Sequence, residues 1–550
     1  MVAGAWPGAA GPGPRREVVF GNIQEPSSLN PLVITGAVEK ALTVLYTALV
    51  ENVKNDRLEP LNEYVEQVPT LRNGLWKVFP DGRMELTWRL RRDLKWHDGR
   101  PLTAADVLYT WELWRNPQGP FGARPTLPDI ESIRQVDDHT LLVRFRQPNA
   151  RANLLWLGAF PAPVPRHVVE PMVRRTGIER FAEILYGQDP RVTVGVGPFI
   201  LKSWLRGNEM VFEANPNYHL GRPALDRVVF RFFSDINTMV ANFMAGTLDA
   251  ASPAPGGIPL GQVMEIETLL RQGRMQGYQV QFFPAPSSEA FFPNYENLHL
   301  RDRRVRQALL YASDREGIVQ GVFRSRVPVA HSYLPSTHPW YLKEIRRYPY
   351  DPDRARRLLE EAGWRAGPDG IRRNAAGERL GFVVTSTAGD RTRERIQQIL
   401  QAQWREAGIE MVIDNKPARV ILAESWATRR RPPDFINFSE YVDDFTDIDL
   451  RFGSWNIRPV GQRSGNATGF RSEEFDRILR TYQRALDLRE RMRLHQEFQR
   501  VWAEEAVMFL IYNQVGAAVW REGFLGLRPL GLAQTPGYWT WNARRWTWTR

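Results

Sequence analysis

The stretch from Met84 to Trp114 constrains the fold of this chain more than any other segment. Its first residues alternate apolar and polar side chains, as a half-buried strand does, and Pro80-Asp81-Gly82 before it predicts a turn. Residues 75–79 and this strand are therefore expected to pair as a hairpin. Thr103 and Asp106 then follow in the order of a capping box at the start of a helix. The segment predicts a strand, a turn and a capped helix, which is a unit of α/β structure.

The whole chain is large and of ordinary globular composition. At 550 residues it exceeds what a single hydrophobic core supports, so two or three domains are expected. Its hydrophobic fraction is 43% and its charged fraction 25%, and no apolar run reaches the about 18 residues of a membrane-spanning helix. The net charge of +11 comes mostly from scattered arginines without a lysine-rich tail, so no nucleic-acid partner is expected.

The sequence contains no cysteine, which excludes disulfides, zinc–thiolate sites and a cysteine nucleophile. Residues 1–15 are rich in Gly, Pro and Ala and lack the basic and apolar blocks of a signal peptide, so they are expected to form a linker. We expect that a secretion signal, with or without a lipid anchor, precedes residue 1 before processing. The expected location of the protein is therefore extracytoplasmic, in the periplasm or on the outer face of the cell membrane.

Residues 90–111, LRRDLKWHDGRPLTAADVLYTW, resemble the signature of the family 5 extracytoplasmic solute-binding proteins. These are the oligopeptide- and dipeptide-binding components of ABC importers. Further matches lie at VGVGPFILKSW (194–204), at NYENLHLRDRRVRQALLYASDR (294–315) and at DPDRARRLLEEAGW (351–364), so the resemblance covers residues 16–520. Gly195 and Gly197 also suggest a phosphate loop, but a strand rather than a helix is expected after them, so we expect them to allow a sharp turn.

The resemblance implies an α/β fold of the periplasmic-binding-protein type (type II, cluster C). In that fold two lobes are joined by a two-strand hinge, and lobe one carries an extra subdomain. The expected segments are a linker at 1–15, lobe one at 16–54, 189–283 and 488–550, its subdomain at 55–188, and lobe two at 284–487.

Peptide-binding members of the family hold an extended ligand as an added strand, so the resemblance implies one ligand-binding strand in each lobe. The residues expected to bind ligand are Ile34, Thr35, Gly36 and Ala37 in lobe one, and Phe438, Ser439, Glu440 and Tyr441, after Asn437, in lobe two. In such relatives an acid after the second strand pairs with the ligand's α-amino group. Asp443, with Asp444 beside it, is the counterpart here, although this chain lacks the Pro that often follows. A solvated acidic loop is the alternative interpretation.

The function implied is the extracytoplasmic substrate-binding component of an ABC importer, which captures a peptide between two lobes and delivers it to a membrane permease. The same fold and role with an oligosaccharide or a metal chelate is the alternative. Nineteen tryptophans would suit stacking on sugars, but most of them occur at core spacing. We expect the protein to be a monomer.

An enzyme is not expected. Asp443 and Asp444 are adjacent, so on an extended segment their side chains point in opposite directions and do not form a glycosidase pair. No serine nucleophile elbow occurs, and His167, His331 and His338 are not spaced as metal ligands. We therefore expect no cofactor and no bound metal.

Overall fold

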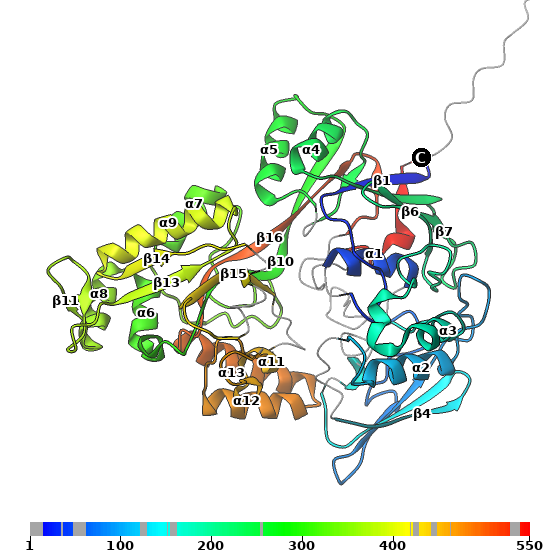
Figure 1. Ribbon diagram of the computed structural model, residues 1–550, viewed down its shortest axis with the longest axis horizontal. Helices are drawn as coiled ribbons and strands as arrows, with labels where there is room; N and C mark the ends of the chain where they lie inside the picture. Colours follow the sequence, from blue (N-terminus) through cyan, green and yellow to red (C-terminus); the bar gives the residue numbers. More distant parts are fainter. Residues whose placement is uncertain are drawn as a thin grey trace, which may run out of the picture.

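The computed structural model describes residues 15–34, 37–47, 62–121, 129–150, 152–154, 162–253, 257–417, 420–421, 428–441, 448–462, 464–528 and 539–549. Two bodies of mixed α/β structure lie on either side of two long crossing strands (Figure 1). A ten-stranded sheet runs through both bodies in the order β14-β13-β15-β10-β16-β9-β1-β8-β7-β6. None of the helices in the described part of the chain has the length and apolar character needed to cross a bilayer.

The first body is built on one half of this sheet. Its strands are β1 (Glu17–Asn22), β6 (Phe199–Leu205), β7 (Glu209–Ala214), β8 (Arg227–Phe232) and β9 (Ala250–Ala251). Its helices are α1 (Ala37–Thr47), α4 (Ile236–Met244) and α5 (Leu260–Arg271). The C-terminal segment returns here with β17 (Phe524–Leu525) and β18 (Thr547–Trp548). Phe20 of β1 is fully buried and stacks on Phe230 with the ring centroids 5.2 Å apart, so the sheet and the C-terminal Trp546 share one core.

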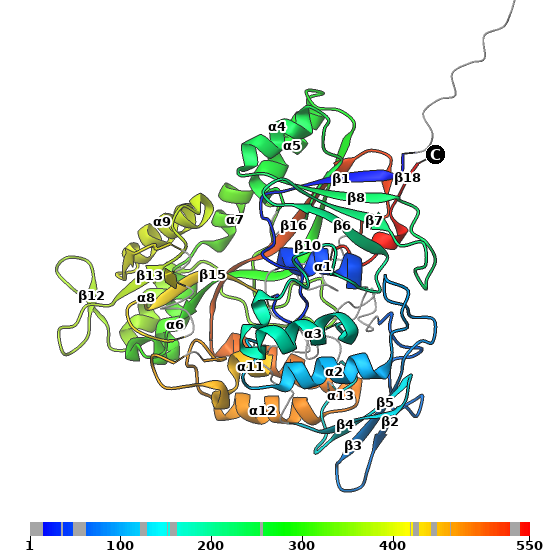
Figure 2. The ribbon, with the colours of Figure 1, turned by 45° about the vertical axis from the view of Figure 1, so that its right-hand side comes forward.

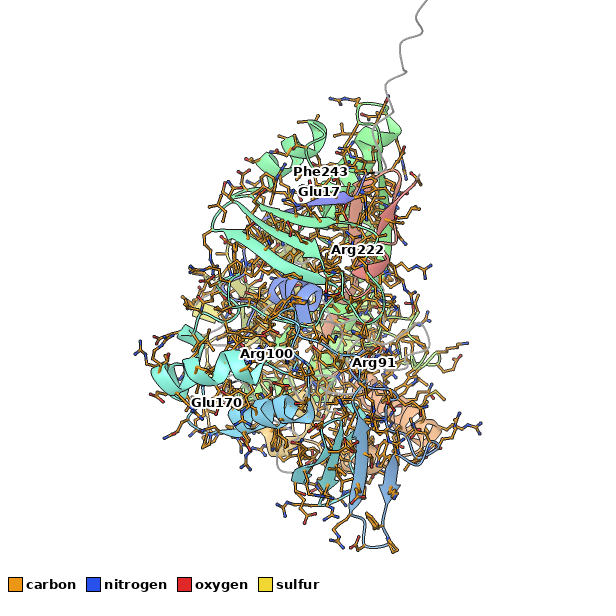
Figure 3. All side chains as sticks on the ribbon, turned by 90° about the vertical axis from the view of Figure 1, so that its right-hand side faces the viewer. Glu17, Arg91, Arg100, Glu170, Arg222 and Phe243 are labelled. Carbon is orange, nitrogen blue, oxygen red and sulfur yellow. The ribbon has the colours of Figure 1, made fainter. Side chains whose placement is uncertain are left out.

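A separate four-stranded sheet contains the expected hairpin. Its order is β2 (Trp76–Val78), β3 (Met84–Arg89), β5 (Thr140–Phe145) and β4 (Ile130–Asp137), and it packs with α2 (Ala104–Arg115) and α3 (Arg166–Thr176). The antiparallel pairing of β2 with β3 confirms the hairpin. The capping box is confirmed as well, since the Thr103 amide donates to the Asp106 carboxylate over 3.0 Å. Seen from the side, this sheet lies below the larger one, with Glu17 of β1 above and Arg91 below (Figures 2 and 3).

The two glycines of the VGVGPF segment join the small sheet to the first body. The Gly195 carbonyl accepts from the His97 amide over 2.8 Å, and the Gly197 carbonyl lies 3.1 Å from His97 Nε2. A Cβ on Gly195 would lie 2.0 Å from the carbonyl oxygen of Tyr46. At Gly195 a glycine is therefore required by close contact with the backbone of Tyr46, since its φ is not positive. The chain bends at Gly197 and Pro198, as expected.

The second body is built on the other half of the large sheet. Its strands are β13 (Gly381–Thr385), β14 (Glu410–Ile413) and β15 (Phe435–Tyr441), with the small pair β11 (Arg365–Ala366) and β12 (Arg372–Arg373). Its helices are α6 (Arg303–Tyr311), α7 (Arg315–Phe323), α8 (Pro352–Glu361), α9 (Arg391–Glu406), α11 (Ile448–Phe452), α12 (Glu473–Arg484) and α13 (Leu488–Glu504). The helix α13, which the expected boundaries assign to lobe one, packs here against α12.

Strands β10 (Tyr278–Pro293) and β16 (Phe509–Arg521) run through both bodies as an antiparallel pair. One end of each strand lies in the core of the first body, where Gly516 accommodates the ring of Phe283. The other ends lie in the second body, where the rings of Phe291 and Phe509 are 5.4 Å apart. The register of the pair shifts between Pro284 and Ser288. We call residues 287–289 of β10 and 512–514 of β16 the crossing.

Candidate ligand-binding site

One edge of strand β15, beside the crossing, pairs with no described strand beyond Ile436. One edge pairs with β10 along its whole length, from Phe435 opposite Pro293 to Tyr441 opposite Ser287. The other edge pairs with β13 only at Phe435 and Ile436, and then the Asn437 carbonyl accepts from the Ser386 hydroxyl over 2.9 Å. No strand in the described part of the chain pairs with this edge from Phe438 onward. Such an edge is able to take up an added extended segment.

The side chains behind this edge form a buried polar network centred on Glu289. Its carboxylate accepts from Arg393 over 2.7 Å, from the Ser439 hydroxyl over 2.6 Å and from the Asn437 amide over 2.7 Å. Ser439 in turn accepts from Arg393 over 2.8 Å and from Gln514 of β16 over 2.6 Å. The network therefore links α9, β10, β15 and β16 at one point.

Burial makes these contacts strong. Glu289 is 1% exposed, so its charge depends on the guanidinium of Arg393, which also lies over the ring of Phe438. Burial alone would lower the pKa of Arg393, but the nearby Glu289 carboxylate outweighs it and the pKa is raised. Burial and then the Glu289 charge raise the pKa of Tyr512. Both shifts favour the charged form of Arg393 and the neutral form of Tyr512, which are the forms that suit a carboxylate beside them.

The expected residues of lobe two lie on this strand. Phe438 and Ser439 are half-buried, and the Ser439 hydroxyl is committed to the network, which leaves the backbone as the part of Ser439 able to bind a ligand. Glu440 and Tyr441 belong to β15, although only their backbone is described. Asp443 and Asp444 lie outside the described residues.

The described residues that were expected to bind ligand in lobe one, Ile34 and Ala37, do not belong to a strand. Ile34 is half-buried, and its amide donates to the carbonyl of Asn30 over 3.2 Å, which places it at the end of a turn. Ala37 is the first residue of α1, because the apolar positions that follow recur at helical spacing and are buried. Thr35 and Gly36 lie outside the described residues. No backbone hydrogen bond joins Ile34 to the described residues of β15.

The sequence did not point to Glu289, Arg393 or Gln514. Glu289 occurs in an apolar run that predicts only a buried strand, and its partner Arg393 follows 104 residues later on a helix. A charged residue inside such a run is the one available signal, since a buried carboxylate needs a partner.

The structure provides no metal centre among the described residues, where no group of three or more His, Asp or Glu side chains is placed to hold an ion. His167 instead lies 2.6 Å from the Asp98 carboxylate, beside the turn after Trp96.

The chain resembles a known protein family and several proteins of solved structure. Residues 66–459 match the model of the bacterial extracellular solute-binding proteins, family 5 Middle. The chain is 25% identical over 513 residues to the oligopeptide-binding protein AppA of Bacillus subtilis, covering 90% of this chain and 86% of AppA. It matches the oligopeptide-binding protein of Thermus thermophilus, solved with a pentapeptide, with a TM-score of 0.77, 26% identity and coverage of 98% and 97%.

The same fold also occurs with a different ligand. NikZ of Campylobacter jejuni, solved with Ni(L-His), matches with a TM-score of 0.76 and 22% identity over 97% of this chain and all of NikZ. The family model spans well over half of the present chain, which confirms the family resemblance of its sequence motifs. The chain therefore belongs to the bacterial extracellular solute-binding proteins of family 5, which bind a solute and do not transform it.

Proposed function

We propose that this protein is the extracytoplasmic receptor of an ABC importer and that its solute is a peptide held in an extended conformation. The edge of β15 that pairs with no described strand beyond Ile436 supports this proposal, because an extended segment could add to it. The buried network behind the edge fixes β15 and occupies the Ser439 hydroxyl. Recognition through the backbone alone would give affinity with little dependence on the peptide's sequence.

We further propose that the two bodies are lobes and that the crossing is their hinge. Cores on each side of the crossing support this division, and they suggest that the chain returns to lobe one near Gly516 and not at residue 488. A ligand that contacts both lobes would favour the closed form by its difference in affinity for the two states. Moving the population from mostly open to mostly closed takes about 5 kcal/mol of such difference.

The proposed contact for the ligand's α-amino group is Asp443. An ammonium enclosed without a partner costs several kcal/mol, so a carboxylate is needed near the end of β15. Asp443 follows the last residue of β15 by two positions. Asp443→Asn should weaken peptide binding by about 100-fold and leave the melting temperature of the free protein unchanged. Asp444→Asn is the matched control and should bind within a few fold of the parent; equal affinities of all three proteins would remove Asp443 from the site.

A ligand screen tests the solute class directly. Melting temperatures are measured with short peptides, with cello- and xylo-oligosaccharides, and with nickel–histidine and other nickel chelates. We expect peptides to raise the melting temperature by mass action, while the other ligands leave it unchanged. Peptides methylated at alternate backbone nitrogens sharpen the test, because they lose the hydrogen bonds of an added strand. A shift with a sugar or chelate and none with peptides would reject the peptide assignment.

A metal chelate is the second candidate. It is favoured by the shared fold with NikZ, and the described residues would leave coordination of the metal to the chelator. In either case the receptor needs a membrane permease as its partner, because a binding protein of this family delivers its solute and does not itself cross the bilayer.

A further inference from the structure

Arg315 is a buried cation at the first position of α7. Arg315 is only 4% exposed. Its guanidinium donates to the backbone carbonyls of Ala330 at 2.8 Å, Leu510 at 3.1 Å and Tyr348 at 2.9 Å. These bonds use Nη1 and Nη2, whereas Nε is buried and has no acceptor. One donor of a charged group is therefore unpaired in the core of the second body.

Three other buried arginines of this protein pair with carboxylates. Arg306 pairs with Glu505 at 3.1 Å and Arg372 pairs with Glu360 at 3.3 Å. Arg429 likewise pairs with Glu296. No described carboxylate forms an ion pair with Arg315, and the nearest acid acting on it, Glu316, has an exposed side chain. Burial lowers the pKa of Arg315 to about 10, which still leaves it charged near neutral pH.

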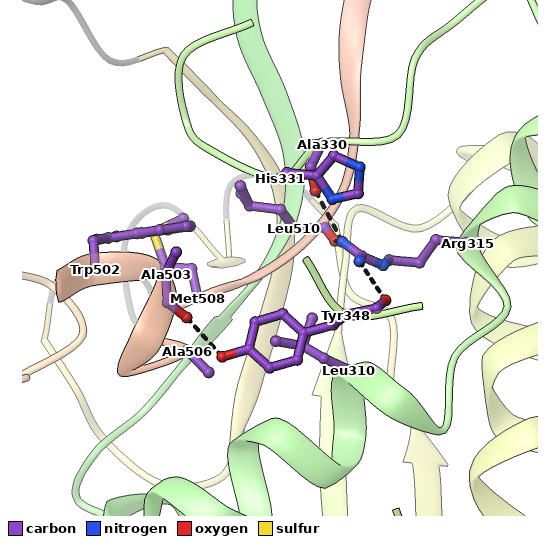
Figure 4. Close-up of a pocket in the computed structure, with 10 residues that line it drawn as sticks. All are labelled: Leu310, Arg315, Ala330, His331, Tyr348, Trp502, Ala503, Ala506, Met508 and Leu510. Atoms are coloured by element: carbon purple, nitrogen blue, oxygen red, sulfur yellow. Dashed lines mark hydrogen bonds between the residues drawn. The ribbon is translucent and has the colours of Figure 1, made fainter. Parts of the chain in front are cut away.

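Arg315 lines a small pocket between α6, α7, α13 and β16. Figure 4 shows Arg315 reaching into it from one side, with His331 next to the guanidinium and Trp502 on the opposite side. His331 Nδ1 and Trp502 Nε1 are also buried and without a partner. The cavity has a volume of about 20 Å³, which is room for a water-sized occupant such as a single ion and too little for an organic ligand.

The electrostatics of the wall select the charge of an occupant. Arg315 and Trp502 present N–H donors, and neither of those atoms is able to accept a hydrogen bond. Burial and then the charges of Arg315 and Arg347 lower the pKa of His331 to about 4, so the imidazole is neutral and either of its nitrogens is able to carry the proton. A cation is thus repelled, and a small anion gains both a charge partner and donors.

We propose that this pocket binds a monatomic anion of the chloride type, with the Nε–H of Arg315 as its principal donor. The anion would supply the counter-charge that a glutamate supplies to Arg306 and Arg372. Because Arg315 binds carbonyls of β16 and of two loops, the bound anion would stabilise the junction of α7 with β16.

Crystals of the intact protein grown in sodium bromide test the site. We expect an anomalous peak for bromide in the pocket, within hydrogen-bond distance of Arg315 Nε. A pocket that holds only water, with bromide bound elsewhere, would overturn the proposal. This measurement uses the unmodified protein, so it decides the question even if variants at Arg315 fail to fold.

Thermal stability gives an independent readout. At equal ionic strength, the melting temperature should be higher in sodium chloride than in sodium gluconate, by about 1–2 °C for each tenfold rise in halide above its Kd. Arg315→Lys lacks an Nε–H donor at that position and should lose this difference. Arg306→Lys, at a buried arginine that keeps its glutamate, should retain it. Equal melting temperatures of the parent in the two salts, or an undiminished difference in Arg315→Lys, would contradict the proposal.

Discussion

The ends of the β10–β16 pair and its middle are built from different chemistry. At the ends, aromatic side chains fill two separate cores, as Phe283 does over Gly516 and Phe291 does against Phe509. In the middle, Glu289 and Gln514 take part in a network of charged and neutral hydrogen bonds. Apolar packing fixes the ends in position, whereas the middle, beside the register shift between Pro284 and Ser288, is held by hydrogen bonds among buried polar groups. The comparison teaches that the strands are anchored by packing at their ends and by polar contacts between them.

The largest effect is expected at an apolar end. Phe291→Ala removes a fully buried ring that contacts Trp404, Phe435 and Phe509. Loss of its burial and the cavity left behind should lower the free energy of unfolding by about 4 kcal/mol, measured by urea denaturation. Leu488→Ala, at a side chain that is 56% exposed, is the control and should change it by less than about 0.5 kcal/mol. A small loss in Phe291→Ala would show that the end is not an anchor.

The next effect is expected at the charged middle. Glu289→Gln leaves the buried Arg393 without its carboxylate and should lower the free energy of unfolding by about 3 kcal/mol. Glu410→Gln is the matched control, because the ion pair of Glu410 with Arg379 is only half-buried and worth about 0.5 kcal/mol. Ligand affinity should also fall in Glu289→Gln, since the network supports β15. Unchanged stability together with unchanged affinity would argue against a structural role for the middle.

Acid should weaken the first body through His97. Burial lowers the pKa of His97 from 6.5 to about 4. Between those values the unfolded chain binds the proton and the folded chain does not, so the free energy of unfolding falls as the pH drops from 6.5 to 4. The titration of His97 lowers the free energy of unfolding by at most about 3 kcal/mol, and the full loss is reached below pH 4. Denaturation at a series of pH values measures it, and His97→Gln should flatten part of the slope.

His219 and His331 keep their own contributions in that variant, because burial also lowers their pKa values to about 4. A pH profile identical in His97→Gln and the parent would mean that His97 does not titrate on unfolding.

The smallest effect on stability is expected for a neutral bond in the middle. Gln514→Leu removes the hydrogen bond of 2.6 Å to Ser439 and should lower the free energy of unfolding by about 1 kcal/mol. Gln147→Leu removes an exposed side-chain bond to Asp129 and serves as the control, with a smaller loss. If the middle adjusts during binding, Gln514→Leu should change ligand affinity more than Gln147→Leu does. Equal affinities would indicate that the middle remains fixed.

Local patterns predicted much of this molecule. The hairpin at β2 and β3 followed from alternation and a turn, and the capping box of α2 followed from the spacing of Thr103 and Asp106. Such features depend on residues close in sequence, so periodicity and capping rules capture them.

Contacts between distant segments were not predictable from such rules. The apolar stripe of α13 predicts that one face of this helix is buried. It does not identify the body against which that face packs, and in the structure the helix packs against α12. In the same way, nothing near Glu289 identifies Arg393 or Gln514 as its neighbours. The family resemblance predicts the ligand-binding strand at β15, while the network behind that strand required the three-dimensional arrangement.

The position of β16 in the large sheet has a consequence for how the protein is made. This strand ends at residue 521, yet it lies in the interior of the sheet, between β10 and β9. A nascent chain therefore cannot join the two halves of the sheet until nearly all of it has left the ribosome. Until then both halves expose unpaired strand edges, which are able to pair with the edges of other chains.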